Sequence, residues 1–426
     1  MQADDAKAYI VVSGDTHAGA TTDQYRSYLP QRWHDDFDRW AADFSDGWAV
    51  VDELGGELRM GVSSYLSSVN WDSGKRLSDL EGEGIAAEVI YPNTVPPFFP
   101  AGVITAPGPR TAQEYERRWE GVKAHNRWLV DFCAMAPGQR AGLAQLLVTD
   151  VDNAIDEVTR AKENGLRGVL LPVDHFESLN SWFLPKYDPL WRTLAELELP
   201  AHCHSVIPAN AASAENGLAS PALGLYEGST FSKRPLPHFI LSGVFDRFPQ
   251  FKLVMTESMA AWIPATIRSL EAFCAGALQP GSITHKFGHE AVSRLSRTPG
   301  EYFASNCYVA SYLTAEDIRV RDQVGVDRMI WGADYPHHEG TWPYTRRAYR
   351  LNFAAVPEEE TRMILGQNAV RLYGLDEARL QDIANRIGPK PQDVAQPLTD
   401  DEWPAGSLCP TFLDRRDMEA MFSGGR

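Results

Sequence analysis

The run YIVVSGDTH, residues 9–17, is the first of eight short β-branched or apolar runs that each end in polar residues and precede a helical stretch. Strands buried on both faces read as nearly continuous apolar runs, as expected for a parallel sheet covered by helices. The other seven runs are GIAAEVIYPN (84–93), RAGLAQLLVTD (140–150), GLRGVLLPVDH (165–175), ELPAHCHS (198–205), FKLVMTES (251–258), YFASNCYVAS (302–311) and DRMIWGADYPHH (327–338).

The segments between these runs have the pattern of amphipathic helices. Residues 152–165, DNAIDEVTRAKENG, place apolar side chains at helical spacing and stop at Gly165. Strand followed by helix, repeated eight times, is the pattern of a closed parallel barrel. No GxGxxG follows the first strand and no GxxxxGKS loop is present, which disfavours nucleotide-binding folds. The sequence therefore predicts an α/β fold, a (β/α)8 TIM barrel.

The length of 426 residues fits one such barrel with insertions. We expect the barrel to occupy residues 1–375, with a loop insertion near 19–75 after the first strand and another near 206–237 after the fifth. Residues 376–426 are polar and proline-dotted. They predict a C-terminal extension that packs on the barrel or on a partner subunit.

Composition excludes several classes of protein. With 44% hydrophobic and 23% charged residues, the chain can bury a sizeable core. A net charge of −17 without a Lys and Arg run argues against a nucleic-acid surface and against an anionic membrane. The five cysteines are scattered, and the N-terminus does not fit a secretory signal. We therefore expect a cytoplasmic protein that acts on a small molecule.

Three of the eight runs supply candidate ligands at their ends, all of them Asp or His, residue types that commonly bind metal ions. Asp15 and His17 are two apart at the end of the first run, so their side chains share one face. His204 ends the fifth run and Asp334 the eighth. In a closed barrel these four side chains converge at the C-terminal mouth, where they form a mixed nitrogen and oxygen site for one divalent ion. Zn2+ is the first choice and Mn2+ the second.

Other polar residues at the ends of these runs are expected to bind substrate. His202 lies one layer deeper than His204, and a hydrogen-bonded core histidine is its alternative interpretation. The expected substrate-binding residues are His175, His202, Asn306 and His337.

Several of these motifs together resemble one family, the amidohydrolase superfamily, in the amidohydrolase 2 branch that contains aminocarboxymuconate semialdehyde decarboxylase and the γ-resorcylate-type decarboxylases. The resemblance runs from about Tyr9 to Tyr373. It implies metal ligation by the same four residues, and a homodimer. The motifs are SGDTHAG, EGIAAEVIYPN, GLRGVLLP, LPAHCHS, GVFDRFPQFKLVMTES and DRMIWGADYPHHEGTWP.

Two positions depart from the family pattern. Some members carry a second histidine two residues after the first on strand one, where this chain has Gly19. Many members place a histidine at the end of strand six, where this chain has Glu257. A carboxylate there can accept a proton from metal-bound water, whose pKa the ion lowers towards ~7. As an acid, Glu257 would need its pKa raised by burial, since an unperturbed Glu titrates near ~4.3.

The sequence therefore favours a metal-dependent hydrolase that acts on a small carbonyl or carboxylate compound through metal-activated water. Its expected catalytic residues are Asp334, Glu257 and His204. The alternative is a metal-dependent, non-oxidative decarboxylase of an aromatic or unsaturated carboxylic acid. An interpretation from another class is a catalytically silent barrel that binds a metabolite.

Overall fold

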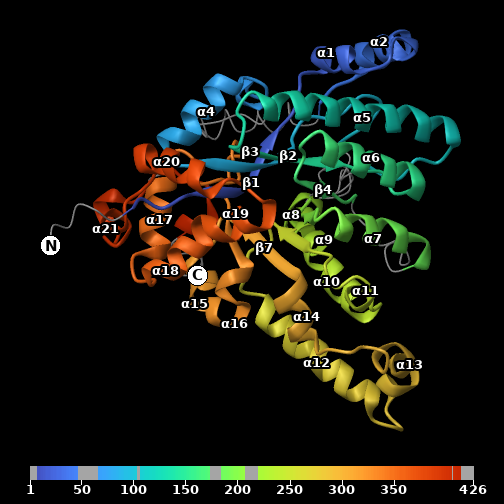
Figure 1. Ribbon diagram of the computed structural model, residues 1–426, viewed down its shortest axis with the longest axis vertical. Coiled ribbons are helices and arrows are strands. Elements are labelled where there is room, and N and C mark those ends of the chain that lie inside the picture. The colour runs from blue at the N-terminus through green and yellow to red at the C-terminus, as the bar shows by residue number, and fades with distance from the viewer. Residues whose placement is uncertain are drawn as a thin grey trace.

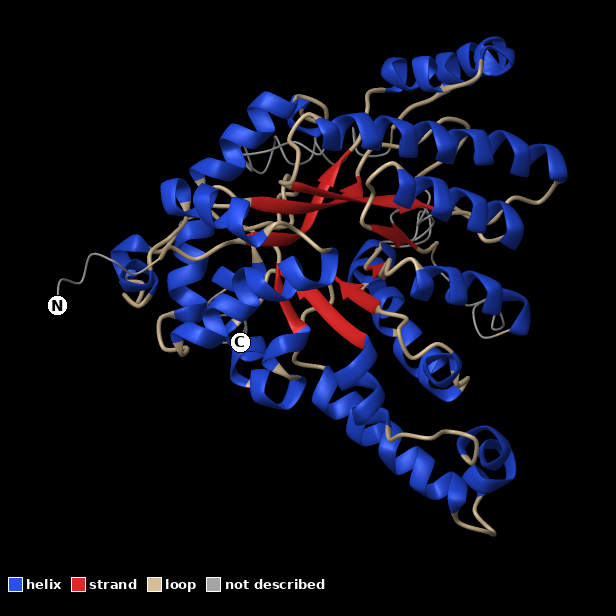
Figure 2. Ribbon diagram, viewed as in Figure 1, coloured by secondary structure: helices blue, strands red, loops and turns tan. Residues whose placement is uncertain are grey.

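The computed structural model describes residues 7–46, 66–102, 106–172, 184–206, 219–404 and 406–413. Eight parallel strands follow one another in chain order, and helices surround them (Figure 1, Figure 2). This arrangement confirms the predicted (β/α)8 barrel. The strands are β1 (Val12–Ala18), β2 (Ala87–Pro92), β3 (Arg140–Gln145), β4 (Gly168–Leu170), β5 (Ala201–His204), β6 (Leu253–Thr256), β7 (Cys307–Ser311) and β8 (Met329–Trp331).

Helices form most of the connections between the strands and cover the outside of the barrel. They are α1 (Thr22–Tyr25), α2 (His34–Asp43), α4 (Ser73–Gly82), α5 (Ala112–Ala134), α6 (Val151–Glu163), α7 (Asp188–Glu196), α8 (Ser220–Gly228), α9 (Thr230–Lys233), α10 (Pro235–Leu241), α11 (Val244–Arg247), α12 (Ile263–Leu278), α13 (Ile283–Val292), α14 (Pro299–Asn306), α15 (Ala315–Arg319), α16 (Arg321–Val324), α17 (Thr345–Phe353), α18 (Glu358–Arg362), the π-helix Met363–Gln367, α19 (Asn368–Tyr373), α20 (Glu377–Ile387) and α21 (Pro391–Val394).

All eight predicted runs contain a strand, but one of them begins in an α-helix. Residues 302–306 belong to α14, and only the residues from Cys307 onward form β7. A capping box between Thr298 and Glu301, with Pro299 in the first turn, starts this helix. These start signals outweigh the apolar pattern that suggested a strand.

The barrel closes where β1 meets the chain after β8. Thr16 forms a parallel bridge with Tyr335, and the amide of His17 donates a 2.6 Å hydrogen bond to the Tyr335 carbonyl. We call this contact between β1 and residues 332–335 the seam. Three of the four predicted metal ligands lie on it.

The two predicted insertions are described in part. Helices α1 and α2 lie in the first, whose residues 47–65 are outside the described residues, and α8 and α9 lie in the second, whose residues 207–218 are outside them. After Tyr373 the chain returns to the N-terminal end of β1, where the Tyr9 amide donates to the Pro389 carbonyl at 2.9 Å. In the described ranges, no helix has the length and apolarity needed to span a bilayer.

Candidate metal centre at the mouth of the barrel

Four side chains meet at the C-terminal ends of the strands. Asp15 and His17 lie on β1, where Nε2 of His17 is 3.4 Å from Asp15 Oδ1. Asp334 follows β8, and its Oδ1 is 3.3 Å from the same imidazole nitrogen. His204 ends β5, with its Nε2 3.4 Å from Asp15 Oδ1. All four side chains are almost fully buried, and we call these four residues, which the sequence predicts as metal ligands, the ligand cluster.

The facing atoms of the ligand cluster fit a cation. Both oxygens of each carboxylate, and Nε2 of each histidine, make no hydrogen bond of good geometry in the part of the chain that the structure describes, although Nδ1 of His337 lies 2.9 Å from Asp334 Oδ1. Burying a carboxylate in this way is costly unless a positive charge compensates it. Donors bound at about 2.1 Å to one ion lie about 3.0–3.4 Å apart, and the separations of Asp15 from His17, Asp15 from His204 and His17 from Asp334 match that range. Two imidazoles and two carboxylates suit Zn2+ or Mn2+.

Backbone carbonyls fix the orientation of both imidazoles. Nδ1 of His17 lies 3.2 Å from the Pro92 carbonyl, and Nδ1 of His204 lies 2.7 Å from the Ser205 carbonyl. A carbonyl only accepts, so in each ring Nδ1 carries the hydrogen and donates it. Nε2 of each ring is therefore the nitrogen available to a metal ion.

Local backbone geometry brings the acidic side chains to the centre. Asp334 and Glu257 both have a φ of 54°, in the left-handed region that costs a non-glycine residue on the order of 1–3 kcal/mol. A Cβ on Gly332 would lie 2.6 Å from the Cβ of Asp15, so glycine lets β1 and β8 approach closely. At Gly19, the departure from the family pattern, a Cβ would lie 2.2 Å from Thr94 Oγ1, so no histidine fits there.

Glu257 lies beside the ligand cluster, directly after β6. Its Oε2 is 3.4 Å from Nδ1 of His204, and its side chain is 18% exposed. Burial raises the pKa of Glu257 well above its usual value, and the nearby carboxylates of Asp334, Asp15 and Glu339 raise it further. Glu257 therefore lies at the mouth of the barrel in a setting that favours the protonated form of its carboxyl group.

His337, which the sequence predicts to bind substrate, lies at the mouth beside Asp334. Its ring stacks on that of His17 with centroids 3.9 Å apart, and its Nδ1 lies 2.9 Å from Asp334 Oδ1. Its Nε2 lies 3.1 Å from Asn93 Oδ1. Together with His17, it holds the pKa of Asp334 below the usual value although burial, the largest single cause, acts in the opposite direction.

Two tyrosines at the site were not predicted. Tyr312 follows β7, and its pKa is raised well above its usual value by burial and by the charges of Glu257 and Asp334, which places it at the mouth. Tyr91 lies one residue before the end of β2, and its ring centroid is 4.9 Å from that of His204. The only signal in the sequence is that each lies at the end of an apolar run.

Two predicted substrate-binding residues, His202 and Asn306, lie away from the mouth. His202 is completely buried below the mouth, where its Nδ1 lies 2.6 Å from the Tyr91 hydroxyl, so the alternative of a hydrogen-bonded core histidine fits and substrate contact does not. Asn306 precedes β7 and lies at the opposite end of the barrel. Its amide donates to the carbonyls of Pro249 and Phe251, so it does not reach the mouth. His175 lies outside the described residues.

Metal affinity is expected to fall as the pH falls. Burial lowers the pKa of His17, but the adjacent carboxylates of Asp15 and Asp334 outweigh burial and raise it to about 10. In the metal-free protein His17 is thus protonated at neutral pH, and a metal ion must displace that proton. We expect Mn2+ affinity to rise by roughly tenfold per pH unit between about pH 6 and 8. Calorimetry in buffers of different ionisation enthalpy should detect the released proton; an affinity independent of pH would contradict ligation by His17.

Comparison with protein families and curated proteins gives related sequences. A family model described as "Amidohydrolase" matches residues 71–375, more than half of the chain. A gamma-resorcylate decarboxylase of Rhodococcus jostii (strain RHA1) is 24% identical over 299 residues, covering 64% of this chain and 82% of that protein. A gamma-resorcylate decarboxylase of Rhizobium sp. (strain MTP-10005) is 24% identical over 322 residues, covering 71% and 87%.

Solved structures share the fold. The 5-carboxyvanillate decarboxylase of Sphingomonas paucimobilis superimposes with a TM-score of 0.62 at 18% identity, covering 87% of this chain and 100% of that chain. A dihydroxybenzoic acid decarboxylase of Polaromonas sp. JS666, solved with bound manganese and the inhibitor 2-nitroresorcinol, gives a TM-score of 0.59 at 18% identity, covering 87% and 99%. At this level of identity the likeness is one of fold.

Proposed function

Because the chain belongs to the amidohydrolase family, we propose that it is a metal-dependent decarboxylase of a small aromatic carboxylic acid. The observation that carries this proposal is the position of Glu257, a largely buried carboxyl group beside the ligand cluster, whose Oε2 lies 3.4 Å from Nδ1 of His204. Relatives named gamma-resorcylate decarboxylase support the same reaction.

This proposal reverses the order of the two reactions that the sequence suggested. Hydrolysis was favoured because an ordinary glutamate is ionised at neutral pH and acts as a base. Burial of Glu257 weakens that argument, since a raised pKa favours the protonated carboxyl group, which can act as a general acid. Hydrolysis through activated water is the second candidate, which the family description "Amidohydrolase" favours.

The four residues of the ligand cluster would hold one divalent ion. We propose Mn2+ in place of the expected Zn2+, since relatives of this fold were solved with manganese and half of the donors are carboxylates. Such an ion would supply positive charge that stabilises the substrate carboxylate. The histidine rings stay neutral and oriented through their Nδ1 hydrogen bonds, and His337 holds Asp334.

Glu257 then performs the proton transfer. Its carboxyl gives a proton to the ring carbon that bears the substrate carboxylate. The bond between that carbon and the carboxylate breaks, its electron pair restores the aromatic ring, and CO2 leaves. Glu257 is left as a carboxylate and regains a proton from water before the next turnover.

The products distinguish the two reactions. With 2,6-dihydroxybenzoate and 5-carboxyvanillate as probes, we expect Mn2+-loaded protein to release CO2 in equal amount to a decarboxylated phenol. In D2O the phenol should carry deuterium at the vacated carbon, and in H2 18O it should carry no label. Mass spectrometry of the organic product, with chelator-treated protein as the control, makes the measurement. Labelled oxygen in the organic product from a wider set of esters and amides would establish hydrolysis instead.

A further inference from the structure

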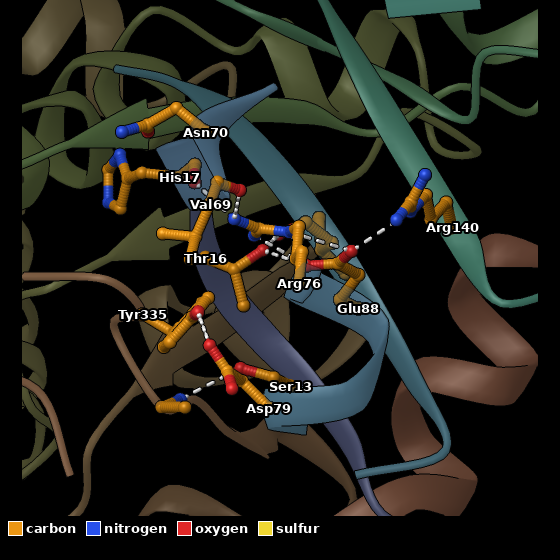
Figure 3. A network of polar contacts seen from close by, with 12 residues as sticks. Ser13, Thr16, His17, Val69, Asn70, Arg76, Asp79, Glu88, Arg140 and Tyr335 are labelled. Atoms are coloured by element: carbon orange, nitrogen blue, oxygen red, sulfur yellow. Dashed lines mark hydrogen bonds and ion pairs between the residues drawn. The ribbon is translucent and has the colours of Figure 1, made fainter. Parts of the chain in front are cut away.

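A buried ion pair lies against the outside of the strand that carries Asp15 and His17. Arg76 comes from α4 and Glu88 from β2, and their side chains are 0% and 3% exposed. Nη2 of Arg76 donates to Glu88 at 2.6 Å, and Nε donates to both of its oxygens at 2.9 and 3.0 Å. Figure 3 shows Arg140 on the other side of Glu88, with its Nε 3.1 Å from the carboxylate.

The pair costs desolvation that a purely structural contact would avoid. Burial raises the pKa of Glu88, but Arg76 and Arg140 outweigh burial and lower it, so Glu88 is ionised. Apolar side chains of similar volume often stabilise a fold as well as a buried ion pair does. The contacts that this pair makes with its surroundings are therefore the informative ones.

Both members of the pair form hydrogen bonds with β1, at His17 and at the adjacent Thr16. Nη1 of Arg76 donates to the carbonyl of His17 at 2.7 Å, and Thr16 Oγ1 donates to Glu88 Oε2 at 2.9 Å (Figure 3). The ladder between β1 and β2 shifts its register between Ser13 and Thr16. These side-chain contacts therefore fix β1 where its regular pairing is interrupted.

Helix α4 also contacts Tyr335, which lies on the other side of the seam from β1. The guanidinium of Arg76 lies 5.1 Å from the ring centroid of Tyr335, the residue after Asp334. The Tyr335 hydroxyl donates to Asp79 of α4 at 2.7 Å (Figure 3). Arg76 thus contacts both chain segments that supply the three seam ligands.

From these contacts we propose that Arg76 is a positioning residue that sets the spacing of the metal ligands across the seam and so determines metal affinity. The inference rests on the metal centre proposed above. Partners that orient metal ligands from outside typically contribute 10- to 100-fold in affinity, roughly, when tested by mutation.

The test compares substitutions of Arg76 and Arg140, the two arginines that bind the carboxylate of Glu88. Arg76→Met removes the guanidinium that contacts His17 and Tyr335, whereas Arg140→Met removes a guanidinium whose other hydrogen bonds go to Ser73 and Phe132. We expect both to lower the thermal stability of the metal-free protein. Only Arg76→Met should weaken Mn2+ binding, by about 10- to 100-fold in calorimetry with the metal alone. It should also change the visible absorption of the Co2+-loaded protein.

Arg76→Lys keeps the charge beside Glu88 if Arg76→Met does not fold. A guanidinium can donate to Glu88 and to the His17 carbonyl at the same time, whereas the compact ammonium of lysine cannot reproduce this geometry. Weakened Mn2+ binding is therefore again expected. Equal Mn2+ affinity in the Arg76 variants, the Arg140 variant and the wild type would overturn the inference. A wild type that binds no Mn2+ would instead refute the proposed metal centre.

Discussion

Replacing His204 by alanine is expected to abolish stoichiometric metal binding and to reduce turnover by at least about 1,000-fold. The residue supplies one of only two imidazoles in the ligand cluster, and its Nε2 lies 3.4 Å from Asp15. A bound ion contributes several kcal/mol of charge stabilisation in the transition state, and each ~1.4 kcal/mol is about a factor of ten in rate. Elemental analysis of dialysed protein and an assay of CO2 release check both parts.

The fold should survive this substitution. His204 lies at the mouth and not in the packed layers below it, so the metal-free variant and metal-free wild type should have similar circular dichroism spectra. Both must be compared without metal, because a bound ion raises stability by mass action. His289→Ala, on the exposed face of α13, is the matched control and should keep full metal content and activity. A fully active His204→Ala protein would contradict the assignment.

Replacing Glu257 by glutamine is expected to reduce decarboxylation by about 100- to 10,000-fold while the metal content stays at one ion per chain. Glutamine keeps the size of the side chain but has no acidic proton. The substitution also removes a buried ionisable group, so stability should not fall. Single-turnover rates and metal analysis on the same preparation separate loss of the proton donor from loss of the ion.

The Glu339→Gln variant tests whether Glu339, rather than Glu257, donates the proton to the substrate. Glu339 belongs with Glu257 and Asp334 to a group whose carboxylate oxygens lie within 4.8 Å of one another. A large loss in Glu339→Gln together with normal turnover in Glu257→Gln would transfer the role to Glu339. Normal turnover in both variants would refute a glutamate donor at this site.

The fold was predictable because its signal is local and repeated. Each barrel strand is buried on both faces, so each appears as a short apolar run, and eight of them alternate with helices. The boundary error at residues 302–306 arose because Tyr302, Phe303 and Ala304 give this segment the apolar character of a strand. The capping box that starts α14 at Thr298 was the stronger signal. The family match to residues 71–375 confirms the resemblance inferred from the motifs.

The site was predictable only in part. Residues at strand ends converge in any closed barrel, which is why the four members of the ligand cluster could be named. Asn306 was misplaced because it precedes its strand, so it lies at the other end of the barrel. The raised pKa of Glu257 depends on burial and on neighbours that are distant in sequence, and no local pattern reports it.

The buried ion pair of Arg76 and Glu88 was missed for a different reason. An arginine on a helix usually points to solvent, and nothing near Arg76 in sequence shows that it reaches β1. The available signal was Glu88, a charged residue inside the otherwise apolar run AEVIYP. A buried strand carries a carboxylate only when a partner compensates it, so this residue predicts a buried cationic side chain.

The central claim is that one divalent ion binds between β1, β5 and the end of β8. Anomalous diffraction from crystals grown with Mn2+ tests it most directly, because manganese can be located by its own scattering. We predict one strong peak within about 2.0–2.3 Å of donor atoms of Asp15, His17, His204 and Asp334. A peak at another site, or no peak at these four residues when Mn2+ is in excess, would contradict the account.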